Sequence, residues 1–139
     1  MKSLWFTLAI TLSVFVQPVR AETPQQILSA YTAEAARQTA NYKPSPDRGR
    51  QFFTQHRSTH EKMPNCAACH GDNPTTAGRH VITNKTLEPL APVSGSERFT
   101  SATKVEKWFR RNCGEVVGRE CTAAEKADFL RYLLSTVGA

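Results

Sequence analysis

The residues Cys66-Ala67-Ala68-Cys69-His70 constrain this chain more than any other feature of its sequence. Both thiols lie within one helical turn, and the histidine follows them directly. At this spacing the thiols can add to the two vinyl groups of a single porphyrin, and the histidine then lies beneath the iron as its axial ligand. The motif therefore predicts one covalently attached haem c, bound through Cys66 and Cys69, with His70 as the proximal ligand.

Two other kinds of Cys-x-x-Cys site fit the sequence less well. A thioredoxin-like dithiol follows a strand in a βαβ unit, whereas polar residues of helical or loop character precede Cys66. A structural zinc site requires a second ligand pair at short spacing. Cys113 and Cys121 are eight positions apart and have no neighbouring histidine, so they do not supply that pair.

Residues 1–21 have the parts of a secretory signal peptide. Lys2 precedes an apolar stretch from Leu4 to Val16, and Val19-Arg20-Ala21 fits cleavage after Ala21. An apolar stretch of about 13 residues is too short for a membrane anchor. We therefore expect export into an oxidising compartment and a mature chain of residues 22–139.

The mature chain contains four segments with the helical spacing of apolar residues and no credible strand, so the predicted fold class is all-α. Thr23, Ser45 and Thr122 are typical N-terminal caps, and Thr122 with Glu125 forms a capping box. The predicted helices cover residues 24–40, 46–56, 101–113 and 122–138. Residues 71–100 are rich in Gly, Pro, Thr, Asn and Ser, and they predict a long ordered loop that wraps a cofactor.

The order of these segments resembles the small class I cytochrome c fold, with residues 22–44 as an N-terminal helical extension. In that fold the helix before the haem motif crosses the C-terminal helix at a glycine and an aromatic residue. The resemblance implies that Gly49 or Phe53 contacts Phe129 or Tyr132. Residues 22–139 would then form a single domain around one haem.

The excess of basic residues is moderate, because 18 Lys and Arg against 12 Asp and Glu give a net charge of +6. They form no run of about five or more, which argues against nucleic-acid binding. Lys104, Lys107, Arg110 and Arg111 gather in the predicted third helix. We expect a solvated helix face there, with haem propionates or a redox partner as the alternative contacts.

The sixth ligand of the iron decides whether such a protein carries electrons or binds a small molecule. Met63 is the one methionine outside the signal peptide, and it precedes Cys66 so closely that it belongs to the proximal side. His56 and His60 also precede the motif closely and are expected at the surface or in the core. His80, in the long loop, remains a candidate for bis-histidine ligation.

Asn112 is the other candidate, because it continues the predicted apolar face of Val105, Trp108 and Phe109. Spacing alone favours a hydrogen bond to the backbone for such a residue. The residues by themselves therefore leave the sixth ligand open between His80 and Asn112.

Two stretches resemble the sphaeroides haem protein family: the haem motif, and Arg111-Asn112-Cys113 followed by Gly118-Arg-Glu-Cys121-Thr. Members of this family are high-spin monohaem cytochromes c of bacterial periplasms. The resemblance, which extends from about Ser45, implies that Asn112 is the distal ligand and that Cys113 and Cys121 form a disulfide. It also implies oxygen binding after reduction, and electrons from a dihaem cytochrome c that is fed by a membrane cytochrome b.

Together these inferences predict a periplasmic cytochrome with His70 and Asn112 as axial ligands. A neutral carboxamide is a weak, hard ligand that ferric iron tolerates and ferrous iron holds poorly, so reduction should open the site to oxygen or nitric oxide. Two alternatives remain. One is a low-spin electron carrier with His80 as sixth ligand, and the other is an oxidase or peroxidase-like haem enzyme that acts on oxygen, peroxide or nitric oxide.

Overall fold

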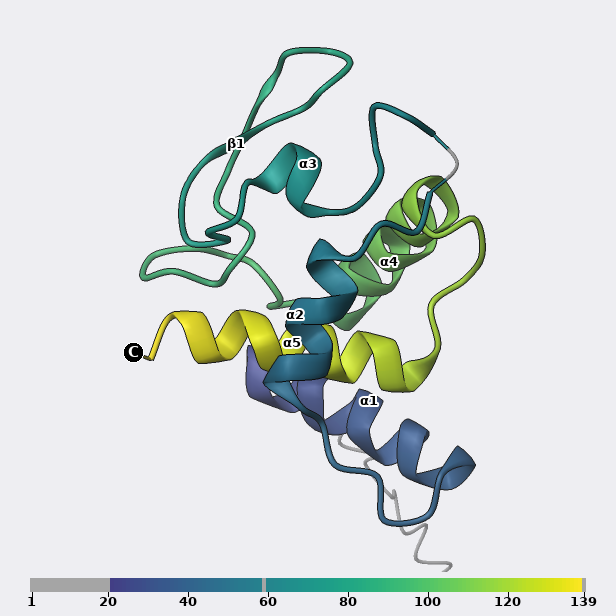
Figure 1. Ribbon diagram of the computed structural model, residues 1–139. Helices are drawn as coiled ribbons and strands as arrows, with labels where there is room; N and C mark the ends of the chain where they lie inside the picture. Colours follow the sequence, from purple (N-terminus) through teal and green to yellow (C-terminus); the bar gives the residue numbers. More distant parts are fainter. Residues whose placement is uncertain (1–20, 59, 139) are drawn as a thin grey trace, which may run out of the picture.

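The computed structural model describes residues 21–58 and 60–138, and the predicted signal peptide lies outside the described residues except for Ala21. In this part of the chain the elements are α1 (Pro24–Gln38), α2 (Pro46–Thr54), α3 (Ala67–His70), β1 (Gly78–Arg79), β2 (Thr86–Leu87), α4 (Ala102–Val116) and α5 (Ala123–Thr136) (Figure 1). The fold is mainly helical, as predicted. None of the helices in residues 21–58 and 60–138 is long and apolar enough to cross a membrane.

Three helix starts follow the predicted caps Thr23, Ser45 and Thr122, and Ser101 caps the fourth. Each of these residues accepts a hydrogen bond from the backbone N–H three residues further on. In α1 and α5 the glutamine or glutamate at that third position also accepts from the cap backbone, which completes a capping box. These local bonds satisfy amides that have no partner inside the helix, so each start is set by a few neighbouring residues.

Three details differ from the prediction. The sequence predicted no strand, but β1 and β2 pair antiparallel with Gly78 opposite Leu87, and two-residue strands are too short to show a period. The helix α2 ends at Thr54, so His56 lies beyond it and is exposed. The helix α4 continues past Cys113 to Val116 and stops before Gly118, where φ is +77°.

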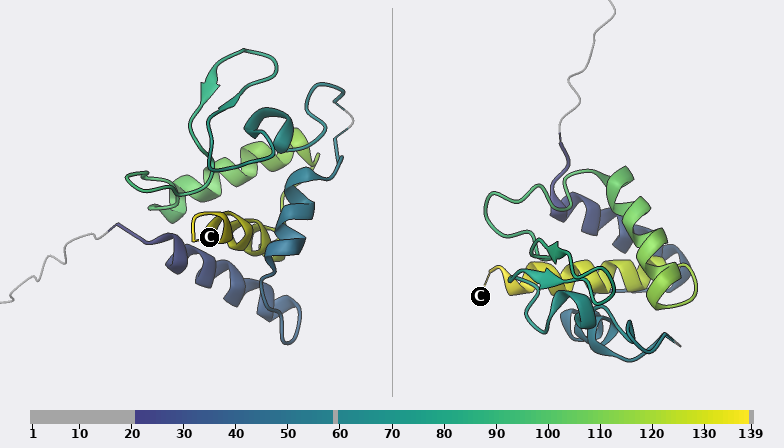
Figure 2. Two further views of the ribbon diagram at one scale, coloured as in Figure 1. Left: turned by 60° about the vertical axis from the view of Figure 1, so that its left-hand side comes forward. Right: turned by 90° about the horizontal axis from the view of Figure 1, so that it is seen from above.

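The core forms where α2 crosses α5 and α1 packs along the other side of α5 (Figures 1 and 2). A Cβ atom built on Gly49 would lie 2.0 Å from the carbonyl oxygen of Asp128 and 2.7 Å from the Cβ of Tyr132. The fully buried Phe53 lies beside Phe129 and Tyr132, with ring centroids 6.2 and 5.7 Å away. The predicted crossing of the two helices is thereby confirmed.

A buried carboxylate joins the start of α2 to α5. Asp128 is 5% exposed, and it accepts hydrogen bonds from the backbone N–H of Ser45 and the hydroxyl of Tyr42, each at 2.7 Å. Arg48 Nε donates to the same carboxylate at 2.7 Å. Burial, and then the hydrogen bond to Asp128, raise the pKa of Tyr42 to about 12, so this hydroxyl keeps its proton at neutral pH. The network holds Gly49 against α5.

Two helical glycines make a matched test of this crossing. Replacing Gly49 with alanine should lower the free energy of unfolding by about 1–3 kcal/mol, because the new methyl group overlaps the α5 backbone. Gly114 in α4 has no atom within 4 Å of a built Cβ, so Gly114→Ala should stabilise by up to about 1 kcal/mol. Guanidinium unfolding of the haem-bound proteins measures both changes. Equal effects of the two substitutions would contradict a close contact at Gly49.

Candidate haem site

The haem motif forms the short helix α3, and Asn65 ties this helix to the end of α2. The Oδ1 atom of Asn65 accepts from the backbone N–H of Ala68 at 2.9 Å, and its Nδ2 atom donates to the carbonyl of Thr54 at 2.7 Å. The predicted site did not include Asn65. Its signal in the sequence was an asparagine just before a helical turn, a place where this residue type satisfies free amides.

The β1–β2 hairpin passes directly against α3. A Cβ atom built on Gly78 would lie 2.3 Å from the carbonyl oxygen of Cys69 and 2.8 Å from the Cα of His70, so no larger residue fits at this position. The backbone N–H of Val81 lies 3.5 Å from the sulfur of Cys69. The loop between α3 and α4 is thus folded back onto the haem motif, and it restricts where a cofactor can lie.

Two of the three titratable groups of the motif, Cys66 and His70, are partly buried and have shifted pKa values. Burial is the main cause that raises the pKa of the Cys66 thiol to about 11. Burial, followed by the charges of Arg98 and His80, lowers the pKa of His70 to about 4. The imidazole of His70 is therefore neutral at pH 7, which is the form that binds a metal ion.

A cavity of about 1010 Å³ opens beside these groups, and Cys66, Cys69 and His70 all line it. Its volume lies at the upper end of the roughly 300–1,000 Å³ usual for cofactor sites. Phe52, Phe109 and Phe129 supply aromatic surface to its lining, and both motif cysteines are free thiols. A large, flat, apolar group that reacts with two thiols and is ligated by one histidine fits this lining, which matches haem c.

The face of α4 is divided between the core and this cavity. Val105, Phe109 and Cys113 recur every four residues and are buried, whereas Trp108 and Asn112 also line the cavity but are exposed there. Trp108 was predicted on the apolar face of this helix, and it is 54% exposed where it lines the cavity. A helical period finds an apolar face, but it does not separate a protein core from a cofactor cavity.

Two basic residues of α4 are both exposed and at the cavity. Lys104 and Arg111 were predicted on a solvated helix face, with haem propionates as an alternative contact, and both line the cavity. Arg111 donates to the carboxylate of Glu115 at 3.2 Å, and its guanidinium lies 5.7 Å from the centre of the Trp108 ring. Lys107 and Arg110 are exposed, as expected of a solvated helix face.

The cavity brings both candidate sixth ligands together with His70. Asn112 lines it from α4, and His80 lines it from the hairpin. The Nδ1 atom of His80 accepts from the backbone N–H groups of Ile82 and Thr83 at 3.2 and 3.3 Å, so its Nε2 atom is the one left for a ligand. Met63 borders the same cavity near Cys66, while His60 is exposed.

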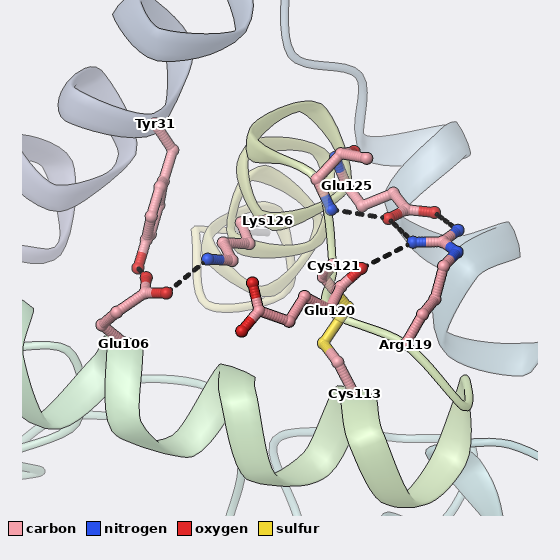
Figure 3. The surroundings of a disulfide bond; sticks show 9 residues. Tyr31, Glu106, Cys113, Arg119, Glu120, Cys121, Glu125 and Lys126 are labelled. Carbon is pink, nitrogen blue, oxygen red and sulfur yellow. Dashed lines mark hydrogen bonds and ion pairs between the residues drawn. A yellow bond between two sulfur atoms is a disulfide. The ribbon is translucent and has the colours of Figure 1, made fainter.

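A disulfide next to Asn112 joins the end of α4 to the start of α5 (Figure 3). Cys113 and Cys121 have Cα atoms 5.7 Å apart and are 4% and 6% exposed. Within the loop that the bridge closes, Arg119 donates to both carboxylate oxygens of Glu125 at 2.8 and 2.6 Å. The turn after Asn112 is therefore held by a covalent bond and by an ion pair.

A second contact fixes the middle of α4, as Figure 3 also shows. Glu106 accepts from the hydroxyl of Tyr31 in α1 at 2.9 Å and from the Nζ atom of Lys126 in α5 at 2.6 Å. Burial favours the protonated form of Glu106, but the hydrogen bonds from Lys126 and Tyr31 outweigh it and hold its pKa below the usual range. The helix that carries Asn112 is thus attached to both of its neighbours.

The disulfide gives a direct chemical test. Thioether bonds to haem would consume Cys66 and Cys69, so thiol titration of the denatured, unreduced haem protein should find no free cysteine. Replacing Cys113 and Cys121 with serine should lower the free energy of unfolding by about 2–3 kcal/mol, because the bridge no longer restricts the unfolded chain. Two reactive thiols in the unreduced wild-type protein would contradict the pairing.

Comparison with known proteins places the chain in a family. A family model described as "Domain of unknown function (DUF1924)" matches residues 39–133. The chain is 39% identical over 112 residues to the cytochrome c-type protein SHP of Cereibacter sphaeroides, covering 80% of this chain and 82% of that protein. The chain belongs to the sphaeroides haem protein (SHP) family. It is also 36% identical over 113 residues to cytochrome c'' of Methylophilus methylotrophus, covering 80% of this chain and 78% of that protein.

Two solved structures of cytochromes have the same fold. Oxidised SHP, described as an oxygen-binding cytochrome c, superposes with a TM-score of 0.74 at 38% identity, covering 83% of this chain and 98% of that one. Oxidised cytochrome c'' gives a TM-score of 0.74 at 35% identity, covering 81% and 93%. This chain is accordingly a monohaem cytochrome c of the SHP family, and haem c is its cofactor.

Proposed function

We propose that this chain is a periplasmic cytochrome that holds haem c between His70 and Asn112 and binds a diatomic ligand after reduction. The observation that carries the proposal is that Asn112 faces the same cavity as His70, on a helix whose sequence contains neither methionine nor histidine. The haem, when bound, supplies a one-electron couple and an iron position that accepts a small ligand.

The Asn112 carboxamide acts as a redox-dependent barrier in this proposal. Its oxygen is a weak, hard donor, which is held by ferric iron and held poorly by ferrous iron. Release of the side chain on reduction leaves the distal side of the cavity open to oxygen or nitric oxide. Two relatives support this sequence of events: SHP is described as an oxygen-binding cytochrome c, and a solution structure of cytochrome c'' is described in terms of haem-ligand detachment.

The electron source in the proposal comes from the family resemblance, and the compartment comes from the sequence. Electrons reach the site from a dihaem cytochrome c, which a membrane cytochrome b reduces in turn. The chain reaches the periplasm by means of the signal peptide in residues 1–21. Because the motif cysteines must meet haem as free thiols, Cys113 and Cys121 are the pair left for oxidation in that compartment.

A low-spin electron carrier is the second candidate, because His80 lines the same cavity as His70. An imidazole would stay bound in both oxidation states and would exclude small ligands. In that case the protein would exchange electrons without binding gas.

Visible spectra separate the two candidates. We expect the dithionite-reduced protein to have a high-spin spectrum that changes on addition of nitric oxide or oxygen. The electron carrier predicts a low-spin spectrum in both oxidation states that is insensitive to either gas. Spectra of oxidised and reduced protein, with and without nitric oxide, therefore test the proposed function directly.

A further inference from the structure

Four cationic side chains line the haem cavity, and one of them differs from the others in burial. The four are Lys85, Arg98, Lys104 and Arg111. Arg98 is partly buried, whereas the other three are exposed. A partly buried guanidinium at a cofactor site is a candidate partner for an anionic group of that cofactor.

The position of Arg98 is fixed by its backbone and by its neighbours. Its backbone N–H donates to the hydroxyl of Ser96 at 3.0 Å, and its guanidinium donates to the carbonyl of Glu88 at 3.3 Å. The next residue, Phe99, also lines the cavity and has a φ of +59°, a conformation that bulky residues rarely adopt. The segment is therefore held in one conformation over the cavity.

The guanidinium of Arg98 has no carboxylate within ion-pair distance among residues 21–58 and 60–138. By contrast, Arg111 on the same cavity pairs with Glu115. A guanidinium carries five N–H donors, and a single carbonyl satisfies few of them. Arg98 thus presents unused donors and an unpaired positive charge at the cavity.

We propose that Arg98 binds a propionate of haem c and keeps a positive charge beside the iron site. Haem carries two propionate carboxylates, and a guanidinium recognises a carboxylate through two parallel hydrogen bonds. Arg98 and His70 also line the same cavity, so the charge of the guanidinium lies on the side of the protein that would hold the iron. A positive charge so placed disfavours the oxidised iron, which carries one more positive charge than the reduced iron.

Replacement of Arg98 with glutamine tests both parts of this inference in the haem-bound protein. The propionate bending mode in the resonance Raman spectrum should shift, because the carboxylate loses its donor. At a fixed ambient potential the ratio of reduced to oxidised haem should fall about tenfold, which corresponds to a potential lower by about 59 mV.

Two further variants serve as controls. Arg110→Gln removes the same charge from an exposed residue of α4 and should change the ratio by less than about threefold, because water and salt screen it. Arg98→Lys keeps the charge but loses the planar fork, so it should restore most of the potential while the propionate mode stays shifted. This variant also supplies the test if Arg98→Gln does not fold.

The inference is overturned if Arg98→Gln leaves both the propionate mode and the potential as in the wild type. It is also overturned if Lys104→Gln shifts the propionate mode and Arg98→Gln does not. The inference rests on haem c in this cavity, but the propionate signal does not depend on Asn112. The proposed role of Arg98 can therefore be refuted without refuting the proposed release of Asn112, and the reverse also holds.

Discussion

Replacing both Cys66 and Cys69 with alanine should produce a chain from which acid–acetone extracts all of the haem. The wild-type chain should keep its haem in the same extraction, because two thioether bonds join it to the polypeptide. The loss of haem should be complete, since Cys66 and Cys69 are the only free thiols at the cavity in the part of the chain that the structure describes. Mass spectrometry of the intact protein measures how much haem stays on the polypeptide.

One single-cysteine variant and one control variant test the same attachment. Cys69→Ala should retain haem on the polypeptide through Cys66 alone. The double replacement of Cys113 and Cys121 with serine should leave the attachment intact, because those sulfurs already bond to each other. Haem that leaves the wild-type chain in the extract would refute covalent attachment. The same spectrum shows whether the mature chain begins at Glu22, as cleavage after Ala21 requires.

The helices could be predicted because their signals are local. A capping residue acts on an amide three positions away, so Thr122 and Glu125 mark the start of α5 without any tertiary information. Gly49 and Phe53 could be assigned to the crossing with α5 because the resemblance to class I cytochromes c supplied the partner helix. The two-residue strands β1 and β2 gave no periodic signal at all.

The cofactor cavity was harder to predict than the helices around it. The period of α4 placed Asn112 on one apolar face with Trp108, and both line the cavity. It gave no sign that the exposed residues Lys104 and Arg111 line the cavity as well. A cavity that holds an aromatic, charged group accepts apolar and basic residues side by side, so hydropathy does not outline it. Arg98 escaped prediction for a related reason, since it lies in a loop that has no period.

Replacing Asn112 with valine should change the ferric spectrum and speed the entry of ligands to the oxidised protein. Valine offers no donor atom, so an incoming ligand such as cyanide no longer competes with a side chain for the sixth position. We expect at least a tenfold rise in the binding rate, about 1.4 kcal/mol in the barrier. Stopped-flow mixing of the oxidised protein with cyanide measures this rate.

Asn112→Met should have the opposite effect on ligand access to the iron. A thioether is a soft ligand that ferrous iron retains, so this variant should stay low-spin on reduction and resist oxygen. The pair of variants distinguishes a ligand from a residue that merely packs in the cavity. A packing residue would alter stability with either substitution, but it would not give opposite changes in ligand access.

His80→Ala decides between the two candidate ligands, because His80 and Asn112 line one cavity with His70. If Asn112 ligates the iron, His80→Ala should leave the ferric spectrum unchanged, and its main effect should be the loss of the hydrogen bonds from Ile82 and Thr83. If His80→Ala changes the axial ligation and Asn112→Val does not, then His80 is the ligand. The distal side would in that case stay closed in both oxidation states, and the protein would be an electron carrier.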